Sequence, residues 1–194
     1  MRAPFHPLPA AAVLLLLSEV LGHSGMAYAA APEPTLSAAL QGQKPVGTAR
    51  LRYWGFDVYD ASLYAAPGFE IQRFENQRFG LELSYLRKLK GADIAERSID
   101  EMKGLATIDP AQAQRWLAAM SALFPDVQSG DRITGVHAPG IGARFYLNGT
   151  LLGEVADDAF SRLFFGIWLS PKTSQPRMRQ ALIQSMVGSA PRAP

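Results

Sequence analysis

The sequence contains no cysteine, which excludes a disulfide framework, a thiolate metal site and a lipid-modified cysteine. The hydrophobic interior alone has to hold the fold, and a hydrophobic content of 48% is adequate for that. Histidine is scarce too, and of the three in the chain only His137 lies beyond residue 30. A histidine metal cluster and a Ser-His-Asp triad are therefore not expected, and we predict a structural role for His137.

A basic block is also missing. The 19 Lys and Arg residues are interspersed with 17 Asp and Glu residues, for a net charge of +2, which gives no support to a nucleic-acid partner. The carboxylate pairs Asp57/Asp60 and Asp157/Asp158 lack the loop pattern of a cation site. We therefore predict no metal, no cofactor and no nucleic acid.

Long hydrophobic runs are absent as well. The run from Ala10 to Leu17 is much shorter than the ~20 apolar residues that span a bilayer. Arg2 precedes it, and small residues at Ala27–Ala31 have the A-x-A spacing of a signal-peptidase site. We predict a signal peptide over residues 1–30 and a periplasmic or secreted protein with no stable membrane span after cleavage; an uncleaved anchor is the alternative. No pattern bears on the oligomeric state.

The stretch from Arg50 to Tyr64 is the most informative feature that is present. It alternates like one long strand, which places Arg50 and Arg52 on the same face as Trp54 and Phe56. A guanidinium on a buried face must be paired or must bind an anionic ligand, because an unpaired buried charge is very costly. This pattern predicts an anion-binding site.

The arginines also have a simpler interpretation, and so do the aromatic residues further along the chain. Each arginine could form a structural ion pair with Glu82, Asp100 or Glu101. The aromatic residues Phe160, Phe164, Phe165 and Trp168 have helical spacing, which is typical of a core but also of an apolar cavity wall.

The order of elements indicates an α+β domain over residues 47–188, a large antiparallel sheet with helices packed on one face. Residues 31–46 are expected to be a flexible lead-in with a possible first strand at Thr35–Leu40. Asn148-Gly149 between alternating apolar runs is a strong hairpin signal. The other expected elements are strands at 50–64, 79–86, 131–138, 143–147 and 150–155, and helices at 94–105, 110–123, 157–169 and 176–188.

Four segments, in this order, resemble the chalcone isomerase-like superfamily, and most closely its bacterial secreted branch. They are GTARLRYWGFDVYDASLY, LELSYLRKLKGADIAERSIDEM, ARFYLNGTLLGEV and FFGIWLSPKTSQPRMRQAL, which together reach from Gly47 to Leu182. The resemblance implies an open-faced β-sandwich, in agreement with the α+β reading of the elements.

The resemblance also implies where a catalytic set would lie. The plant enzymes of the family close a phenolate onto an enone with the help of an arginine, a tyrosine, an asparagine and a threonine. The arginine falls on Arg50 or Arg52. The tyrosine and the asparagine fall near Ile94–Ala95 and Glu101–Met102, and the threonine falls on Ile167, so none of these three residue types is matched.

Other relatives in the superfamily bind fatty acids, with an arginine holding the carboxylate. We therefore predict a non-catalytic binder of a fatty acid or similar amphipathic carboxylate, with no catalytic residue. One alternative is an isomerase for a chalcone or another enone, in which Tyr53, Tyr59 or Tyr85 supplies the acid; another is a structural or assembly module of the envelope. The predicted ligand-binding residues are Arg50, Arg52, Trp54, Phe56, Phe164, Ile167 and Trp168.

Overall fold

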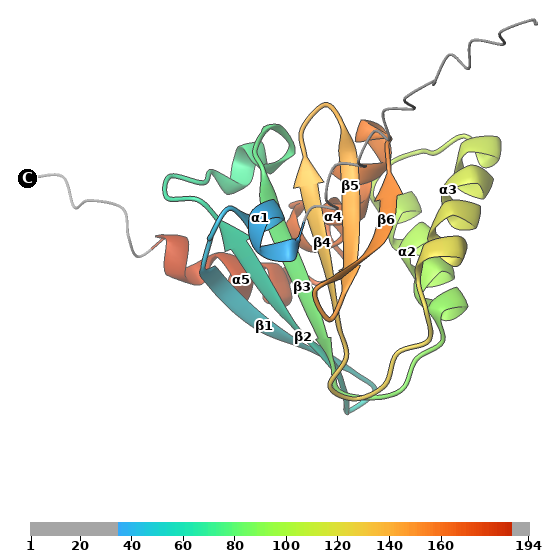
Figure 1. The fold of residues 1–194 in the computed structure, drawn as a ribbon, viewed down its shortest axis with the longest axis horizontal. Helices are drawn as coiled ribbons and strands as arrows, with labels where there is room; N and C mark the ends of the chain where they lie inside the picture. Colours follow the sequence, from blue (N-terminus) through green and yellow to red (C-terminus); the bar gives the residue numbers. More distant parts are fainter. Residues whose placement is uncertain (1–34, 188–194) are drawn as a thin grey trace, which may run out of the picture. The chain divides into compact units, whose positions relative to one another are not determined.

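An antiparallel sheet of six strands forms the centre of the domain (Figure 1). The computed structural model describes residues 35–187, except the side chains of residues 185–187, so the predicted signal peptide over residues 1–30 lies outside the described residues. Each strand pairs with the next one along the chain, because every connection is either a tight turn or a return over one face of the sheet. The strands are β1 (Pro45–Tyr53), β2 (Phe56–Ala65), β3 (Phe79–Tyr85), β4 (Arg132–Ala138), β5 (Gly142–Leu147) and β6 (Thr150–Val155).

Helices cover one face of this sheet, which confirms the predicted α+β class. Figure 1 shows α4 behind the strands, and α2, α3 and α5 contribute buried residues to the same apolar cluster. The short helix α1 packs on the opposite face, where Leu40 joins a small cluster with Val136 and Tyr146. The helical elements are α1 (Leu36–Leu40), a 3-10 segment η1 (Ile71–Asn76), α2 (Gly91–Leu105), α3 (Pro110–Leu123), α4 (Asp158–Leu169) and α5 (Pro176–Val187).

Helix starts follow the capping signals of the sequence. The Asp109 carboxylate accepts a hydrogen bond from the Gln112 backbone N–H, and Pro110 occupies the first turn of α3. Asp157 caps α4 in the same way, through the Phe160 backbone N–H at 3.0 Å. These two helices therefore begin where the sequence predicts them.

The predicted first strand at Thr35–Leu40 is wrong, because this segment is α1. The Thr35 hydroxyl accepts a hydrogen bond from the Ala38 backbone N–H, and Gln41 closes the helix in a left-handed conformation with φ of 52°. A five-residue helix of this kind depends on a cap at each end and on its apolar side packing against the sheet.

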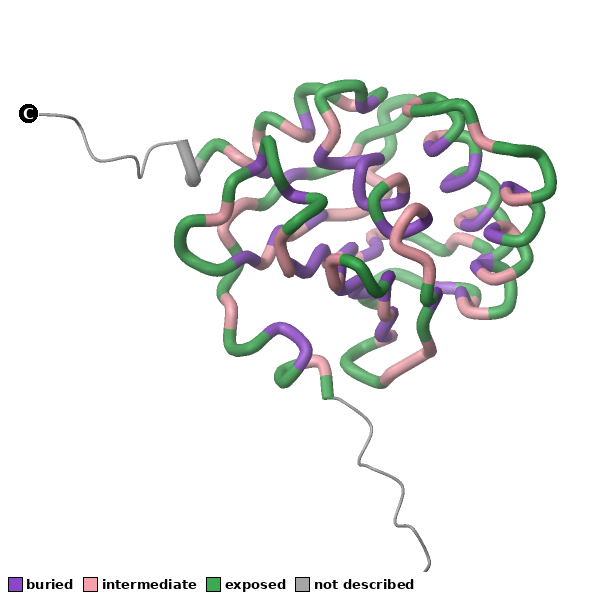
Figure 2. Tube along the Cα trace, turned by 90° about the horizontal axis from the view of Figure 1, so that it is seen from above, coloured by how far each residue is buried: buried purple, intermediate pink, exposed green. Residues whose placement is uncertain are grey.

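Aromatic residues fill the space between the sheet and the helices. Phe164 of α4 lies in contact with the rings of Phe124, Phe145, Phe160 and Trp168. Figure 2 shows the buried stretches running through the middle of the molecule and the exposed stretches at its periphery. The predicted aromatic stripe is thus largely core, and one end of it reaches the cavity described below. Within the described part of the chain, no helix has the length and apolar character that crossing a membrane would require.

Candidate functional site

The predicted long strand over residues 50–64 is in fact a tight hairpin. The chain reverses at Trp54-Gly55, and Tyr53 pairs directly with Phe56. Both turn residues have positive φ, 52° and 79°, as a two-residue type I′ turn requires. The prediction that Arg50, Arg52, Trp54 and Phe56 share one face of a strand is therefore wrong, because the turn interrupts the alternation between the arginines and the aromatic residues.

The two arginines lie on the outer, polar face of this hairpin. Arg50 binds both oxygens of Asp60, at 2.7 and 2.8 Å, and also reaches Asp57 at 2.9 Å. Arg52 binds the other oxygen of Asp57 at 2.6 Å. The hydrogen bond that Arg50 donates to Asp60 is the main cause that raises the pKa of Arg50, and the one that Arg52 donates to Asp57 lowers the pKa of Asp57. Both guanidinium groups thus form ion pairs within the hairpin, with Asp57 and Asp60 and not with the carboxylates expected from the sequence.

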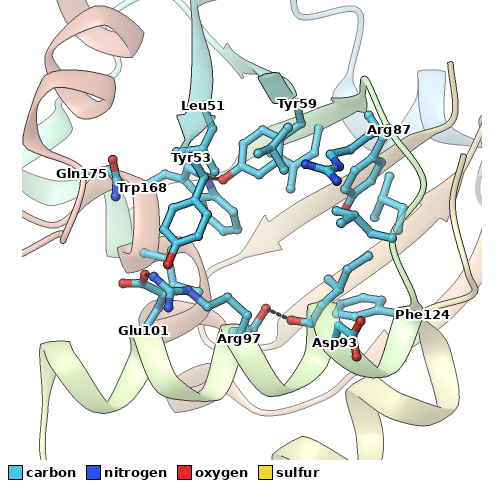
Figure 3. Close-up of a pocket in the computed structure, with 18 of the residues that line it drawn as sticks. Leu51, Tyr53, Tyr59, Arg87, Asp93, Arg97, Glu101, Phe124, Trp168 and Gln175 are labelled. Atoms are coloured by element: carbon cyan, nitrogen blue, oxygen red, sulfur yellow. Dashed lines mark hydrogen bonds and ion pairs between the residues drawn. The ribbon is translucent and has the colours of Figure 1, made fainter. Parts of the chain in front are cut away.

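A cavity of about 360 Å³ opens on the inner face of the same hairpin, between the sheet and α2 (Figure 3). Its volume lies within the usual range for small-molecule sites. The deep part of the cavity is apolar and is formed by residues that are less than 9% exposed. They are Leu83, Tyr85, Phe124, Ile133, Phe164, Ile167 and Trp168.

Three of the seven predicted site residues, Phe164, Ile167 and Trp168, therefore line this cavity, and their role in binding stays a prediction. The other four, Arg50, Arg52, Trp54 and Phe56, do not line it. Trp54 is 84% exposed and Phe56 is 64% exposed at the hairpin turn.

One face of α2 forms the opposite wall. Ile94, Arg97, Ser98 and Glu101 follow each other at three- and four-residue spacing, so all four point to the same side of the helix. The start of α2 is fixed by Gly91, where a Cβ would lie 2.0 Å from the Phe124 carbonyl oxygen. The close approach that glycine allows places the start of α2 against the end of α3.

Polar side chains surround the opening of the cavity. Arg97 forms an ion pair with Glu101, one turn further along α2, so each of the two charges has a partner. Arg87 belongs to the link between β3 and α2, and no carboxylate among the described residues forms an ion pair with it. Its guanidinium carbon lies 5.4 Å from the centre of the Phe56 ring. Tyr53, Arg87 and Asp93 are exposed, and Figure 3 shows them with Gln175 among the side chains that line the cavity.

Two tyrosines of the cavity lining carry hydroxyl groups, of which Tyr85 is buried and Tyr59 is half-buried. The Tyr59 hydroxyl accepts a hydrogen bond from the Trp168 indole N–H at 3.0 Å, which leaves its own proton available. Burial raises the pKa of Tyr59 to about 12, and burial also raises the pKa of Tyr85. Both hydroxyls are therefore neutral hydrogen-bond donors at physiological pH.

Comparisons with known proteins agree with this geometry. Residues 44–184 match the family described as chalcone isomerase-like. The chain belongs to the chalcone isomerase-like family. An uncharacterised protein of Haemophilus influenzae is 31% identical over 141 residues, which cover 72% of this chain and 67% of the relative.

The fold of this chalcone isomerase-like chain is also that of a solved structure, the crystal structure of a fatty-acid binding protein of Arabidopsis thaliana. The TM-score is 0.57 at 13% identity, over 74% of this chain and 88% of the other. At this identity the likeness shows the shared fold, which confirms the predicted open-faced β-sandwich.

The positions that the family resemblance assigned to the tyrosine, the asparagine and the threonine converge on the cavity. Ile94, Glu101 and Ile167 all line it. An isoleucine side chain has no hydrogen-bonding group, and Glu101 is paired with Arg97. The cavity of this chain therefore has none of the three expected residue types at these positions.

His137 lies apart from the cavity, in the apolar interior. One ring nitrogen is 2.7 Å from the Ser161 hydroxyl, and the other is 2.9 Å from the Glu75 carbonyl oxygen. Burial lowers the pKa of His137 and favours the neutral ring. Within residues 35–187 no group of three or more His, Asp or Glu side chains could hold a metal ion.

Arg87 and the wall formed by α2 are the parts of the site that sequence reasoning missed. Arg87 lies in the run Leu86–Lys90, whose three cations interspersed with leucines are typical of a solvated link. The available signal was indirect. Asp57 and Asp60 follow Trp54-Gly55 at distances that let them pair with the preceding arginines across a turn, which would have removed those arginines from consideration.

Proposed function

We propose that this protein binds a fatty acid or a similar amphipathic carboxylate in the cavity, without catalysing a reaction on it. One observation carries the proposal. An apolar cavity of about 360 Å³ lies beneath Arg87, a cation that has no carboxylate partner among the described residues. Arginine binds carboxylates through two parallel hydrogen bonds, so it suits the acid head group while the apolar walls suit the tail.

The energetics favour a ligand with both parts. Burying each methylene group contributes about 0.8 kcal/mol, so a short tail already outweighs the cost of ordering it. The Tyr59 and Tyr85 hydroxyls add neutral donors near the apolar walls. The shared fold with a fatty-acid binding protein supports the same ligand class.

A series of straight-chain acids tests the proposal. We expect the dissociation constant, measured by displacement of a fluorescent fatty acid, to fall about fourfold for each added methylene until the cavity is full. The corresponding methyl esters should bind more weakly. No measurable affinity for any acid, together with an unchanged melting temperature, would favour a structural module of the envelope instead, an alternative that the pairing of Arg50 and Arg52 supports.

An isomerase is the second candidate, because Tyr53, Tyr59 and Tyr85 all line the cavity. A protonated tyrosine can donate a hydrogen bond to an enone oxygen on which negative charge develops. The test is incubation with a hydroxychalcone, followed by absorbance. Ring closure above the spontaneous rate that is lost in Tyr59→Phe would establish this activity; the spontaneous rate alone would dismiss it for that substrate.

The cellular location is part of the proposal. A cleaved leader over residues 1–30 would deliver the binding domain to the periplasm or the exterior. N-terminal sequencing of the protein isolated from its native cells should find a first residue near Ala30 or Ala31. An intact Met1 on the isolated protein would contradict this location.

A further inference from the structure

Exposed aromatic side chains gather at the turn between β1 and β2. Among the described residues, four large hydrophobic side chains are exposed, and three of them are Tyr53, Trp54 and Phe56, with exposed fractions of 56%, 84% and 64%. The fourth is Ile141, at the turn before β5. Such a concentration of exposed apolar surface marks an interaction site more often than chance. We call Tyr53, Trp54 and Phe56 the aromatic turn.

The backbone gives no reason for a tryptophan at this position. Trp54 has φ of 52°, in the left-handed region that disfavours bulky side chains, and so does Asn148 with φ of 51° at the turn between β5 and β6. Asn148 suits its turn, because its side chain hydrogen-bonds both the Arg132 backbone and Asp131. Trp54 makes no comparable contact and is mostly in solvent. A disfavoured residue at an exposed position points to a role outside the fold.

Basic side chains lie beside the aromatic turn. The Leu86 backbone N–H bonds the Val58 carbonyl at 2.9 Å, which places the following residues next to the hairpin end. Arg87, Lys88 and Lys90 are exposed in this segment, and Arg87 stacks over Phe56.

Acidic residues also lie near this end of the domain. Asp57 is paired with Arg50 and Arg52. Asp126 and Asp131 accept hydrogen bonds from the Gly91 backbone N–H and the Asn148 side chain, which are neutral groups, so these carboxylates keep their charge, and Asp93 lies in the first turn of α2. Within the segment Leu86–Lys90, however, every charged side chain is a cation, so the surface beside Phe56 combines aromatic side chains with positive charge.

We propose that the aromatic turn and the basic segment Arg87–Lys90 dock on the surface of a bilayer that contains anionic lipids. Tryptophan and tyrosine favour the membrane–water interface, and lysine and arginine near it are attracted by anionic head groups. A protein partner fits less well, since three aromatic side chains bury about 150–250 Å² each. Their sum falls short of the roughly 800 Å² per partner in a stable protein interface.

Docking would bring the opening of the cavity to the bilayer, because Tyr53 and Arg87 belong both to this surface and to the cavity lining. The inference does not depend on the proposed ligand. Vesicle binding can be present or absent whether or not the cavity takes a fatty acid, and the two failures are told apart by separate measurements.

The test is co-sedimentation with vesicles of phosphatidylcholine alone or with 30% phosphatidylglycerol, comparing wild type with Trp54→Asn and Ile141→Ser. Trp54→Asn places a favoured residue in the left-handed turn, so this variant should fold at least as stably. We expect wild type and Ile141→Ser to bind the anionic vesicles equally. Trp54→Asn should bind the anionic vesicles at least tenfold more weakly than wild type does, and wild type should bind the neutral vesicles at least tenfold more weakly than the anionic ones. Lys88→Gln with Lys90→Gln should weaken vesicle binding as well, without changing affinity for fatty acids.

Fluorescence adds a readout of insertion. Trp116 and Trp168 are 5% and 6% exposed, so the emission lost in Trp54→Asn reports on the turn. That emission should shift to shorter wavelength on anionic vesicles and be quenched by brominated acyl chains. The proposal is overturned if wild type does not bind anionic vesicles at low salt, if Trp54→Asn binds as wild type does, or if the Trp54-dependent binding is to a protein only.

Discussion

The two faces of the β1–β2 hairpin lie beside arginines whose surroundings differ. On the outer face, Arg50 and Arg52 are held by Asp57 and Asp60. On the inner face, Leu51, Tyr53 and Tyr59 border an apolar cavity, with Arg87 at its opening and no carboxylate paired with it among the described residues. The difference shows that an arginine indicates a binding site through its lack of an internal partner, and not through its place in a strand.

Blocking the inner face should have the largest effect. Ile94→Trp puts an indole into the cavity, and displacing three methylene groups of a fatty acid costs about 2.4 kcal/mol, or roughly fiftyfold in affinity. Thr48→Trp adds the same bulk to the exposed outer side of β1, and it should leave affinity unchanged. Displacement titrations of both variants measure this. Equal loss in the two, with unchanged melting curves, would contradict the assignment of the inner face.

Removing single arginines sharpens the comparison. Arg87→Gln should weaken binding of a long-chain acid about tenfold, since a hydrogen bond to a charged group is worth about 1.5 kcal/mol or more when it is partly shielded from water. Arg50→Gln should leave affinity within about twofold, because its charge is already used by Asp60 and Asp57. Titration calorimetry on the two variants gives the answer. A larger loss of affinity in Arg50→Gln than in Arg87→Gln would indicate that the acid binds at the outer face.

The two inner tyrosines should differ in their contribution to stability. Tyr59→Phe removes the acceptor of the Trp168 indole N–H, and a buried donor without a partner costs about 1–3 kcal/mol. Tyr85→Phe should change the free energy of unfolding by less, because no hydrogen bond to the Tyr85 hydroxyl is formed by the described residues. Urea unfolding measures both values. A greater loss in Tyr85→Phe would show that its hydroxyl has a partner in solution.

The outer ion pairs should give the smallest effect, visible mainly in its pH dependence. Arg52, and then Arg50, lower the pKa of Asp57 below its usual 3.8. A lowered folded-state pKa stabilises the fold above pH 3.8, and this contribution is lost as the pH falls through the lowered value. Asp57→Asn should therefore have a lower urea midpoint than wild type at pH 7 and the same midpoint in strong acid. A pH-independent difference would contradict the ion-pair explanation.

Elements with local chemical signals could be predicted from the sequence. Asn148-Gly149 produced the expected hairpin, and Asp109-Pro110 and Asp157 began the expected helices. In each case a side chain satisfies the backbone next to it, so the cause lies within a few residues. The four family segments extended the prediction from these local elements to the whole fold.

The site was harder, because its causes are not local. Trp54-Gly55 forms the same turn as Asn148-Gly149, but tryptophan is not a turn residue, so alternation alone continued the strand through it. Because of that error, Arg50 and Arg52 were predicted to lie on a buried face, whereas they lie on the exposed face of the hairpin. Arg87 gains its position only from the pairing of β3 with β2, which is not visible in its own segment.

The central claim is that Arg87 and the cavity beneath it bind the acid, and a crystal structure of the protein with a long-chain fatty acid tests it most directly. The account predicts the carboxylate within hydrogen-bond distance of the Arg87 guanidinium. It predicts the tail between the sheet residues Leu83 and Ile133 and the helix residue Phe164. A carboxylate bound by Arg50 or Arg52, or an acid outside an empty cavity, would contradict it.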